Sequence, residues 1–285
     1  MDYYSRIQDA VDYVEDNLTL KITIEDVSNK AYFSMYHFHR IFNAMVGSSV
    51  KDYIRMRRLS EASYELINTE KRILDIALKY QFESQESFTR AFKKMYGVTP
   101  GKYRQNKKHF VLIQKKRLTE IRLNHLKGGI TLKPKIVDKN EFKIVGMKYY
   151  GANKNNEISQ LFNKFFSRID EIKNRIDVRT SLGICEYVPK LTSESEFSYI
   201  ASVEVSSLDE IPEGMVGQVV PSNKYAVFTH RGSIDTLGDT YEYIHGTWLP
   251  KSGYQPAPAN DFELYDERFD PSSNESEMDI YIPIK

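Results

Sequence analysis

The chain has 285 residues, of which 41% are hydrophobic and 28% charged, and this composition is typical of a globular protein with room for two domains. One cysteine excludes an internal disulfide framework, the first residues lack a signal-peptide pattern, and no apolar run approaches the roughly 20 residues of a membrane span. We therefore expect a cytoplasmic protein with no membrane partner.

The net charge of +1 hides an asymmetry along the chain. Residues 1–127 contain 23 Lys and Arg against 15 Asp and Glu, whereas residues 128–285 contain 17 against 24. A basic first part favours a polyanionic partner such as nucleic acid, and an acidic second part suits a cationic ligand or simply keeps the molecule soluble.

Two similar stretches of twelve residues mark the first part of the chain, SMYHFHRIFNAM from Ser34 and SQESFTRAFKKM from Ser84. Each is predicted to be an amphipathic helix, and each follows a shorter predicted helix, at 24–30 and 73–80. We expect Thr23, Ser34 and Ser84 to cap helix N-termini. A short helix, a tight turn and a second helix form a helix-turn-helix motif, whose second helix enters the DNA major groove.

Apolar spacing defines the buried and exposed faces of the two longer helices. The predicted buried residues are Phe38, Ile41, Phe42 and Met45 in the first copy, and Phe88, Ala91, Phe92 and Met95 in the second. The opposite, outer faces carry Tyr36, His39, Arg40 and Asn43 in the first copy, and Glu86, Thr89, Arg90 and Lys93 in the second. The copies therefore share their packing residues and differ on the outer face.

The segment between the copies, residues 48–69, is predicted to be one helix that buries Tyr53, Leu59, Ala62 and Leu66. About 20 residues at about 1.5 Å each span about 30 Å, close to the roughly 34 Å between successive major-groove faces of DNA. One chain is thus predicted to read an asymmetric double-stranded DNA site without dimerising.

Residues 73–104, ILDIALKYQFESQESFTRAFKKMYGVTPGKYR, resemble the signature of the AraC/XylS transcriptional regulators. Thr99 and Pro100 are expected to begin a last short helix. Two positions depart from the family pattern, because its common turn glycine is replaced by Tyr32 in the first motif and by Gln81 in the second. The resemblance implies an activator that contacts RNA polymerase.

The same resemblance implies base-reading roles for Tyr36, His39, Arg40, Gln85, Glu86, Ser87 and Arg90. Arginine forms bidentate hydrogen bonds with guanine, glutamine pairs with adenine, and a carboxylate accepts from cytosine. The other basic residues are expected to contact phosphate or solvent: Arg55, Arg57, Arg58, Lys93, Lys94, Lys102 and Arg104. His37 and His39 lack further ligands at metal spacing, so we expect no metal site.

The predicted domain boundaries are 1–108 for the DNA-binding domain, 109–133 for a basic linker and 134–285 for a second domain. The second domain contains a repeat of its own. Strand, helix, strand and strand are predicted at 141–151, 156–176, 181–189 and 197–205, and the order recurs at 224–232, 236–249, 261–269 and 277–284. The expected fold class is therefore an all-α double helix-turn-helix domain followed by an α+β domain.

The motifs YAVFTHRG, WLPKSG and FELYDERF in this second domain resemble the GyrI-like effector-binding fold, and the whole chain resembles the Rob-type regulators, which have the same domain order. The resemblance implies that Glu263 lies in an aromatic cleft. Tyr265 shares its strand face, and Tyr149 and Trp248 are further candidates for the cleft walls. At the position of Glu263, the first copy has Gly183.

A buried carboxylate beside aromatic rings favours a small lipophilic or cationic effector, because the cation offsets the carboxylate charge and the rings add cation–π attraction. Two alternatives stay open at this point. The second domain acts as a small-molecule hydrolase, with His230, His245 and Glu263 as candidate groups, or it binds another protein. No nucleophile motif, phosphate loop or set of metal ligands is present, and we expect a regulator that is not an enzyme and has no cofactor.

Overall fold

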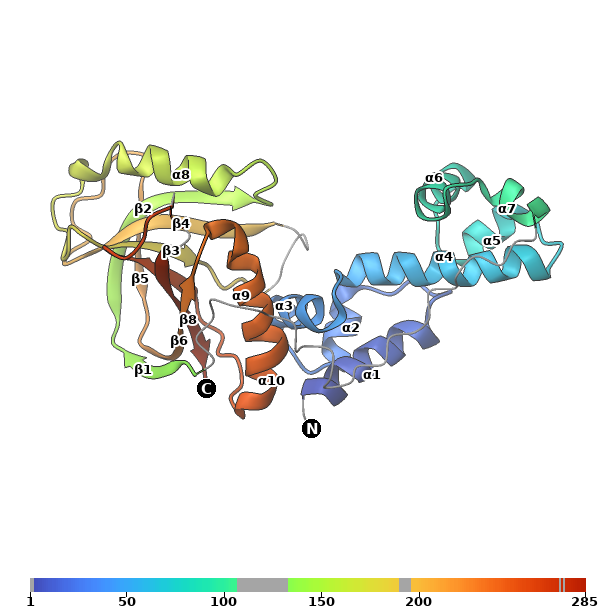
Figure 1. Cartoon of the computed structure of the whole chain (residues 1–285), viewed down its shortest axis with the longest axis horizontal. Helices are drawn as coiled ribbons and strands as arrows, with labels where there is room; N and C mark the ends of the chain where they lie inside the picture. The colour runs from blue at the N-terminus through green and yellow to red at the C-terminus, as the bar shows by residue number, and fades with distance from the viewer. Residues whose placement is uncertain (1–2, 107–132, 190–195, 272, 274) are drawn as a thin grey trace. The chain divides into compact units, whose positions relative to one another are not determined.

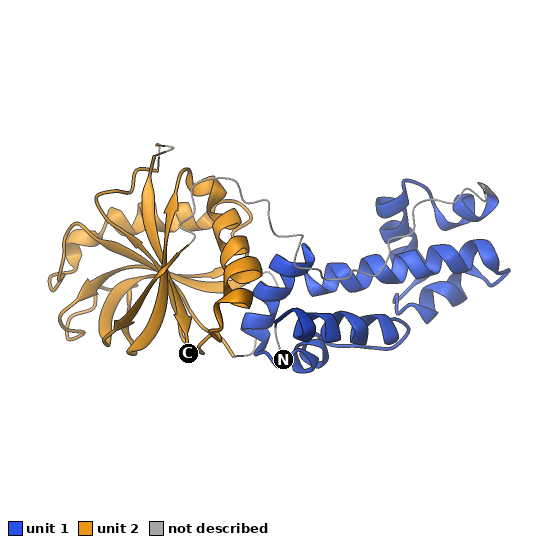
Figure 2. Ribbon diagram, turned by 60° about the horizontal axis from the view of Figure 1, so that its bottom comes forward, with its two compact units in different colours: residues 1–122 blue, residues 123–285 orange. Residues whose placement is uncertain are grey.

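The computed structural model describes residues 3–106, 133–189, 196–271, 273 and 275–285. The chain divides into two compact units, residues 1–122 and 123–285, which are coloured separately in Figure 2. The predicted linker at 109–133, including its basic KKR at 115–117, lies outside the described residues except for Lys133.

The first unit is helical throughout the part that the structure describes (Figure 1). Its helices are α1 (Tyr3–Asp16), α2 (Ile24–Lys30), α3 (Met35–Val46), α4 (Val50–Asn68), α5 (Ile73–Lys79), α6 (Gln85–Tyr96) and α7 (Pro100–Asn106). The two predicted helix-turn-helix motifs are therefore confirmed as α2–α3 and α5–α6, with α4 between them.

The predicted N-caps of this unit are confirmed. The Thr23 hydroxyl accepts from the Asp26 amide while Asp26 accepts from the Thr23 amide, which makes a capping box at α2. Ser34 caps α3 by accepting from the His37 amide, and Ser84 caps α6. These side chains satisfy backbone donors that the first turn of a helix leaves without partners.

The buried faces of α3, α4 and α6 also agree with the prediction. Phe38, Ile41, Phe42, Phe88 and Phe92 are fully buried. Along α4, Tyr53 contacts Phe42, whereas Leu59 and Leu66 belong to a separate cluster with α5, α6 and α7. The two motifs thus pack on different parts of one helix, and we call the two groups, residues 3–54 and 59–106, the first and second heads.

The second unit is built on one eight-stranded sheet, counted over the residues described, in which neighbouring strands run antiparallel. The strands are β1 (Lys135–Lys139), β2 (Phe142–Gly151), β3 (Ser181–Cys185), β4 (Phe197–Val205), β5 (Val216–Val220), β6 (Asn223–Arg231), β7 (Asp261–Tyr265) and β8 (Glu277–Ile284). Their order in the sheet is β1-β6-β8-β7-β3-β4-β2-β5.

This order is a two-fold pattern centred between β3 and β7. The predicted repeat is confirmed as β2-α8-β3-β4 and β6-α9-α10-β7-β8, with helices α8 (Glu157–Phe166), α9 (Leu237–Tyr243) and α10 (Leu249–Ser252). The outer strands β1 and β5 were not predicted. In the chain, β1 directly precedes β2 of the first copy, but it pairs with β6 of the second copy. Likewise, β5 directly precedes β6 of the second copy, but it pairs with β2 of the first copy.

The predicted helix at 156–176 is too long, because α8 ends at Phe166. A 3₁₀ turn follows at Ile169–Glu171, the backbone becomes extended at Ile172, and Arg175 forms a bridge with Val205 of β4. The last ten residues of the predicted helix are therefore a 3₁₀ turn followed by extended backbone that reaches the sheet.

One face of the sheet carries the helices, and the other carries an apolar cluster. Figure 1 shows α8 running along β2 and β4, in agreement with the contacts between these elements. The opposite face buries Phe142, Leu182, Tyr225 and Phe262, so residues of both copies meet there in one core. Between α8 and α9, the helix-bearing face of β3 and β7 holds the candidate ligand site.

Candidate nucleic-acid interface and ligand site

The outer face of α6 combines exposed polar and basic side chains. Gln85, Glu86, Arg90 and Lys93 are exposed, and Thr89 is half-buried beside them. The pKa of the Glu86 carboxyl is lowered by hydrogen bonds from its own backbone and from Ser84, and by Arg90 one turn away. This face therefore carries a charged acceptor and two cations on one short helix.

Ser87 has a structural role in addition to its predicted base-reading role. Its hydroxyl accepts from the Ser84 amide and donates to the Ser84 carbonyl oxygen, while its own amide donates to the Ser84 hydroxyl. This reciprocal capping box fixes the first turn of α6. The side chain is thus already engaged by the protein.

The outer face of α3 is less open than that of α6. Asn43 is exposed, and His39 and Arg40 are half-buried, but Tyr36 is only 5% exposed. The Arg40 guanidinium lies 5.0 Å from the centroid of the Tyr36 ring, which is the geometry of a cation–π contact. Burial, together with Arg40 and Lys51, lowers the pKa of His39, so its imidazole is neutral at pH 7.

Three of the residues expected to contact phosphate make structural contacts within the protein. Arg57 is buried and pairs with Glu15 at 2.8 Å and with Glu61 at 2.8 Å. Arg58 donates to the carbonyl oxygens of the segment after α1, and Arg104 donates to the Leu66 and Lys71 carbonyl oxygens. Apart from Glu61, four residues from Arg57, these partners lie 33 to 42 residues away in the sequence, so helical spacing does not reveal them. The exposed cations Lys93, Lys94 and Lys102 remain available for phosphate.

In the second unit, Glu263 is 6% exposed and accepts hydrogen bonds from three tyrosines. Tyr199 and Tyr265 donate to Oε2 at 2.5 Å and 2.9 Å, and Tyr241 of α9 donates to Oε1 at 2.8 Å. Burial raises the pKa of Glu263, although these hydrogen bonds act in the opposite direction. Burial also raises the pKa values of the Tyr199 and Tyr265 hydroxyls, so both remain donors at neutral pH.

Gly183 makes room for this cluster. It is the register partner of Glu263 across β3 and β7, at the centre of the two-fold pattern. A Cβ atom at Gly183 would lie 1.8 Å from the Tyr199 hydroxyl oxygen and 2.7 Å from Oε2 of Glu263. The first copy therefore has no side chain where the second copy has its carboxylate.

The predicted aromatic walls are distributed differently. Tyr265 contacts Glu263, as described, but Trp248 packs against Phe228 and stacks on Tyr254. The Tyr149 hydroxyl accepts from the Asn153 amide. Sequence reasoning missed Tyr199 and Tyr241; the glycine within β3 was the available signal, since such a glycine often marks the close approach of another group.

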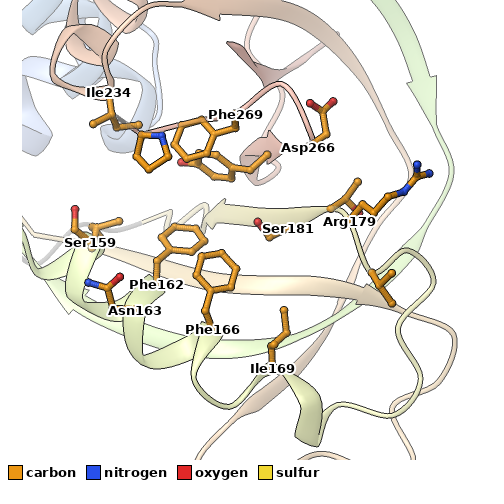
Figure 3. A pocket seen from close by; sticks show the side chains of 15 residues that line it. Ser159, Phe162, Asn163, Phe166, Ile169, Arg179, Ser181, Ile234, Asp266 and Phe269 are labelled. Carbon is orange, nitrogen blue, oxygen red and sulfur yellow. The ribbon is translucent and has the colours of Figure 1, made fainter. Parts of the chain in front are cut away.

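A cavity of about 450 Å³ adjoins the tyrosine cluster. Figure 3 shows the side chains that line this cavity. Tyr265 belongs to both, and the Phe162 ring lies 5.3 Å from the Tyr265 ring and 6.2 Å from the Tyr199 ring. The lining is mainly apolar and comes from α8, from the segment before β3 and from the segment after β7: Ile158, Phe162, Phe166, Ile169, Val178, Tyr265, Phe269 and Pro271, with Arg179 and Asp266 at polar positions.

The histidines considered for a hydrolase have other surroundings. The His230 ring hydrogen-bonds Thr240 Oγ1 at 2.7 Å and the Ser233 carbonyl oxygen at 3.1 Å, so both nitrogens are engaged by the fold. His245 stacks on Tyr241. Among the residues that the structure describes, no cluster of three or more His, Cys, Asp or Glu is placed to hold a metal ion. No described helix is long and apolar enough to cross a membrane.

Comparison with known proteins assigns both parts of the chain. Residues 132–285 match the GyrI-like small molecule binding domain, and residues 27–106 match a helix-turn-helix domain. The chain is 52% identical over 110 residues to the HTH-type regulator YbfP of Bacillus subtilis, covering 39% of this chain and 37% of that protein. It is 40% identical over 151 residues to the transcriptional regulator BrlR of Pseudomonas aeruginosa, covering 53% of this chain and 54% of that protein.

These two matches span about half or less of each relative's own length. A third relative is similar along nearly all of both chains. The transcriptional regulator Rob of Salmonella typhimurium is 26% identical over 269 residues, which cover 93% of this chain and 91% of that protein. This chain therefore belongs to the GyrI-like small molecule binding family and joins that domain to an AraC-type helix-turn-helix domain.

Proposed function

We propose that this protein is a sequence-specific DNA-binding transcription regulator that activates transcription in response to a small lipophilic cation. The observation that carries DNA binding is the outer face of α6, where Gln85, Glu86, Arg90 and Lys93 are exposed on a helix fixed at its start by the Ser84 and Ser87 capping box. Polar side chains on a helix of this kind read base edges in the major groove.

Substitution of one arginine in each head tests the reading role. After selection of a preferred sequence from random DNA, Arg40→Ala and Arg90→Ala are each expected to weaken binding by about 1–3 kcal/mol and to relax preference at separate positions. Lys94→Ala, at an exposed lysine, should weaken all sequences alike and reduce the salt dependence of binding. Equal losses for every sequence with all three variants would reassign both arginines to phosphate contacts.

The ligand proposal rests on the buried carboxylate of Glu263 beside the aromatic cavity. A carboxylate of this kind is stabilised by a bound cation, and the rings of Phe162, Phe166 and Tyr265 offer apolar surface and cation–π attraction. A cation that reaches Glu263 from the cavity must pass or displace Tyr265, whose hydroxyl now donates to the carboxylate. Binding therefore exchanges a hydrogen bond for a charge pair.

Two dyes of similar size, one cationic and one neutral, test this role by fluorescence titration. Glu263→Gln keeps the shape and removes the charge, so it should weaken the cationic dye by at least about tenfold and leave the neutral dye within about twofold. Equal losses for both dyes would mean that Glu263 shapes the site without selecting charge. If the wild-type protein binds neither dye, the second unit is better explained as a protein-binding module.

Regulation requires that the ligand interact differently with two states of the protein. Transcription from a promoter with the selected site, measured with purified RNA polymerase, is expected to rise when the cationic dye is added. At a dye concentration near the wild-type dissociation constant, Glu263→Gln should transcribe close to the ligand-free level. A cationic dye that binds the wild-type protein and leaves transcription unchanged would contradict the activation proposal.

A further inference from the structure

The turns of the two helix-turn-helix motifs share an unfavourable backbone conformation. Tyr32 and Gln81 occupy equivalent positions and have φ values of 54° and 64°. This left-handed region disfavours residues with a Cβ atom, and glycine is the residue that adopts it most easily. Turn geometry alone therefore does not account for a glutamine or a tyrosine at this position.

Gln81 has a contact that explains its side chain. Its Nε2 donates to the carbonyl oxygen of Thr19 at 2.7 Å, across 62 residues of sequence. Thr19 lies in the segment after α1, in the first head, whereas Gln81 follows α5, in the second. Tyr32 at the equivalent position is 75% exposed. The side chain of Gln81 therefore bridges the two heads directly.

The bridge lies at a cleft between the heads. This cleft of about 680 Å³ is lined by Ile22–Ile24 from the first head, by Tyr80–Glu83 from the second, and by Lys51, Ile54, Arg55 and Arg58 of α4. Arg58 holds the same segment from α4, because its Nε and Nη2 donate to the Leu18 and Leu20 carbonyl oxygens at 2.9 Å and 2.7 Å. The segment is thus attached to α4 by Arg58 and to the second head by Gln81.

We infer that Gln81 is a positioning residue that fixes the separation of the two recognition helices, and with it the number of base pairs between the DNA segments they contact. Both heads also pack on α4, so a bend or twist of that helix would change their separation, and the Gln81 bridge is a second attachment that opposes such a change. The inference rests on the proposed DNA-binding function. If the separation is fixed, the protein selects DNA by the number of base pairs between the two contacted segments as well as by the identity of the bases.

DNA sites with altered base-pair spacing test how rigidly the two heads are joined. One inserted base pair shifts the second contacted segment by about 3.4 Å along the DNA axis and rotates it by about 35°. Two rigidly joined heads cannot follow both displacements, whereas two loosely joined heads can. A protein with a fixed separation therefore rejects altered spacing, and a flexible one tolerates it.

The matched variants are Gln81→Met and Tyr32→Met. Methionine has nearly the length of glutamine and no hydrogen-bond donor, so Gln81→Met removes the bridge without changing charge. Tyr32→Met makes an equivalent change at an exposed residue with the same backbone conformation. Only the first variant should alter the relation between the heads.

Binding is measured on the preferred DNA site and on sites with one base pair added or removed between the contacted segments. Wild type and Tyr32→Met should lose about tenfold or more on the altered sites, whereas Gln81→Met should lose no more than about threefold. Unchanged spacing preference in Gln81→Met would overturn the inference, as would equal relaxation in Tyr32→Met.

A second measurement separates this inference from the proposed function, because it uses no DNA. Spin labels on Asn43→Cys and Lys93→Cys, at exposed positions of α3 and α6, report the distance distribution between the heads of the full chain after Cys185→Ser. Gln81→Met should broaden that distribution at least about twofold relative to wild type and Tyr32→Met. Equal widths would overturn the inference even if DNA binding is established, and a chain that selects no DNA sequence would overturn the proposed function.

Discussion

The helix-turn-helix repeat and the strand repeat place their copies in different ways. In the first unit, α3 and α6 belong to separate clusters along α4, with Phe42 against Tyr53 in one and Phe92 near Leu66 in the other. Each copy keeps its own outer face. In the second unit, the copies are related by a two-fold pattern that brings equivalent residues face to face, as Gly183 and Glu263 show.

The difference lies in how much space each copy has. The two helix-turn-helix copies are separated along α4, so neither occupies the other's volume and both can carry DNA-contacting side chains. Copies that meet at an axis compete for one volume, and the Tyr199 hydroxyl and the Glu263 carboxylate already fill the space in front of Gly183. Separation along α4 therefore favours two related DNA-contacting surfaces, whereas contact at a two-fold axis favours one asymmetric ligand site.

The largest expected effect concerns the attachment of α4 to the first head. Arg57→Ala should lower the free energy of unfolding of the first unit by about 3–5 kcal/mol, because it leaves the largely covered carboxylate of Glu15 without its cation. Chemical denaturation followed by circular dichroism measures this loss. Arg55→Ala is the control, since its exposed pair with Asp52 should contribute less than about 0.5 kcal/mol.

Equal effects of Arg55→Ala and Arg57→Ala on stability would mean that the ion pair with Glu15 is not a structural anchor. Arg57 would then return to the set of candidate phosphate contacts. The first head would also be less firmly joined to α4 than the buried Arg57 side chain implies.

The next effect tests the crowded axis of the second unit. Gly183→Ala should destabilise this unit by about 1–3 kcal/mol and weaken cationic ligands, since the new methyl group overlaps the Tyr199 hydroxyl. Adding Tyr199→Phe removes that hydroxyl and should restore part of the stability, a coupling that a double-mutant cycle measures. Gly238→Ala in α9 is the control, because its Cβ would meet nothing within 4 Å.

If Gly183→Ala and Gly238→Ala have the same effect on unfolding, the space in front of β3 is not limiting. Lack of space would then not explain why the second copy has Glu263 where the first copy has Gly183.

The smallest effect is a dependence on pH. Burial raises the pKa of Glu263 in the folded state, so the folded state binds more protons than the unfolded state between the two pKa values. The stability contributed by this group is therefore present below the unfolded pKa and is lost as pH rises through the folded pKa. Glu263→Gln should remove this loss of stability with rising pH. Unfolding midpoints of the wild type and of Glu263→Gln, measured between about pH 4 and pH 8, test this expectation. Parallel profiles for the two proteins would contradict the assignment.

Local pattern was sufficient to predict the helices of the first unit and their caps, because a hydroxyl at Thr23 or Ser84 acts within three residues of its own position. It was also sufficient for the two copies of strand, helix, strand and strand. Short elements whose partner is distant were missed: β1 and β5 are outer strands of five residues, and each pairs with the other copy.

The site shows the same division between local and distant contacts. Tyr265 was predicted because it shares a strand face with Glu263 two residues away. Tyr199 and Tyr241 reach the same carboxylate from 64 and 22 residues away, and their sequence surroundings do not indicate this. The burial of Arg57 was missed for the same reason, since its partner Glu15 lies 42 residues earlier.

The exchange of β1 and β5 between the copies has a consequence for how the chain is synthesised. Pairing between distant segments forms slowly, and here β1 has no partner until β6 has left the ribosome. A nascent chain that ends after β5 also leaves β3, buried in the finished sheet, as an open edge without β7. Open edges pair readily with other chains. We therefore expect the interval between the synthesis of β5 and that of β8 to be the stage at which the nascent chain is most prone to aggregation.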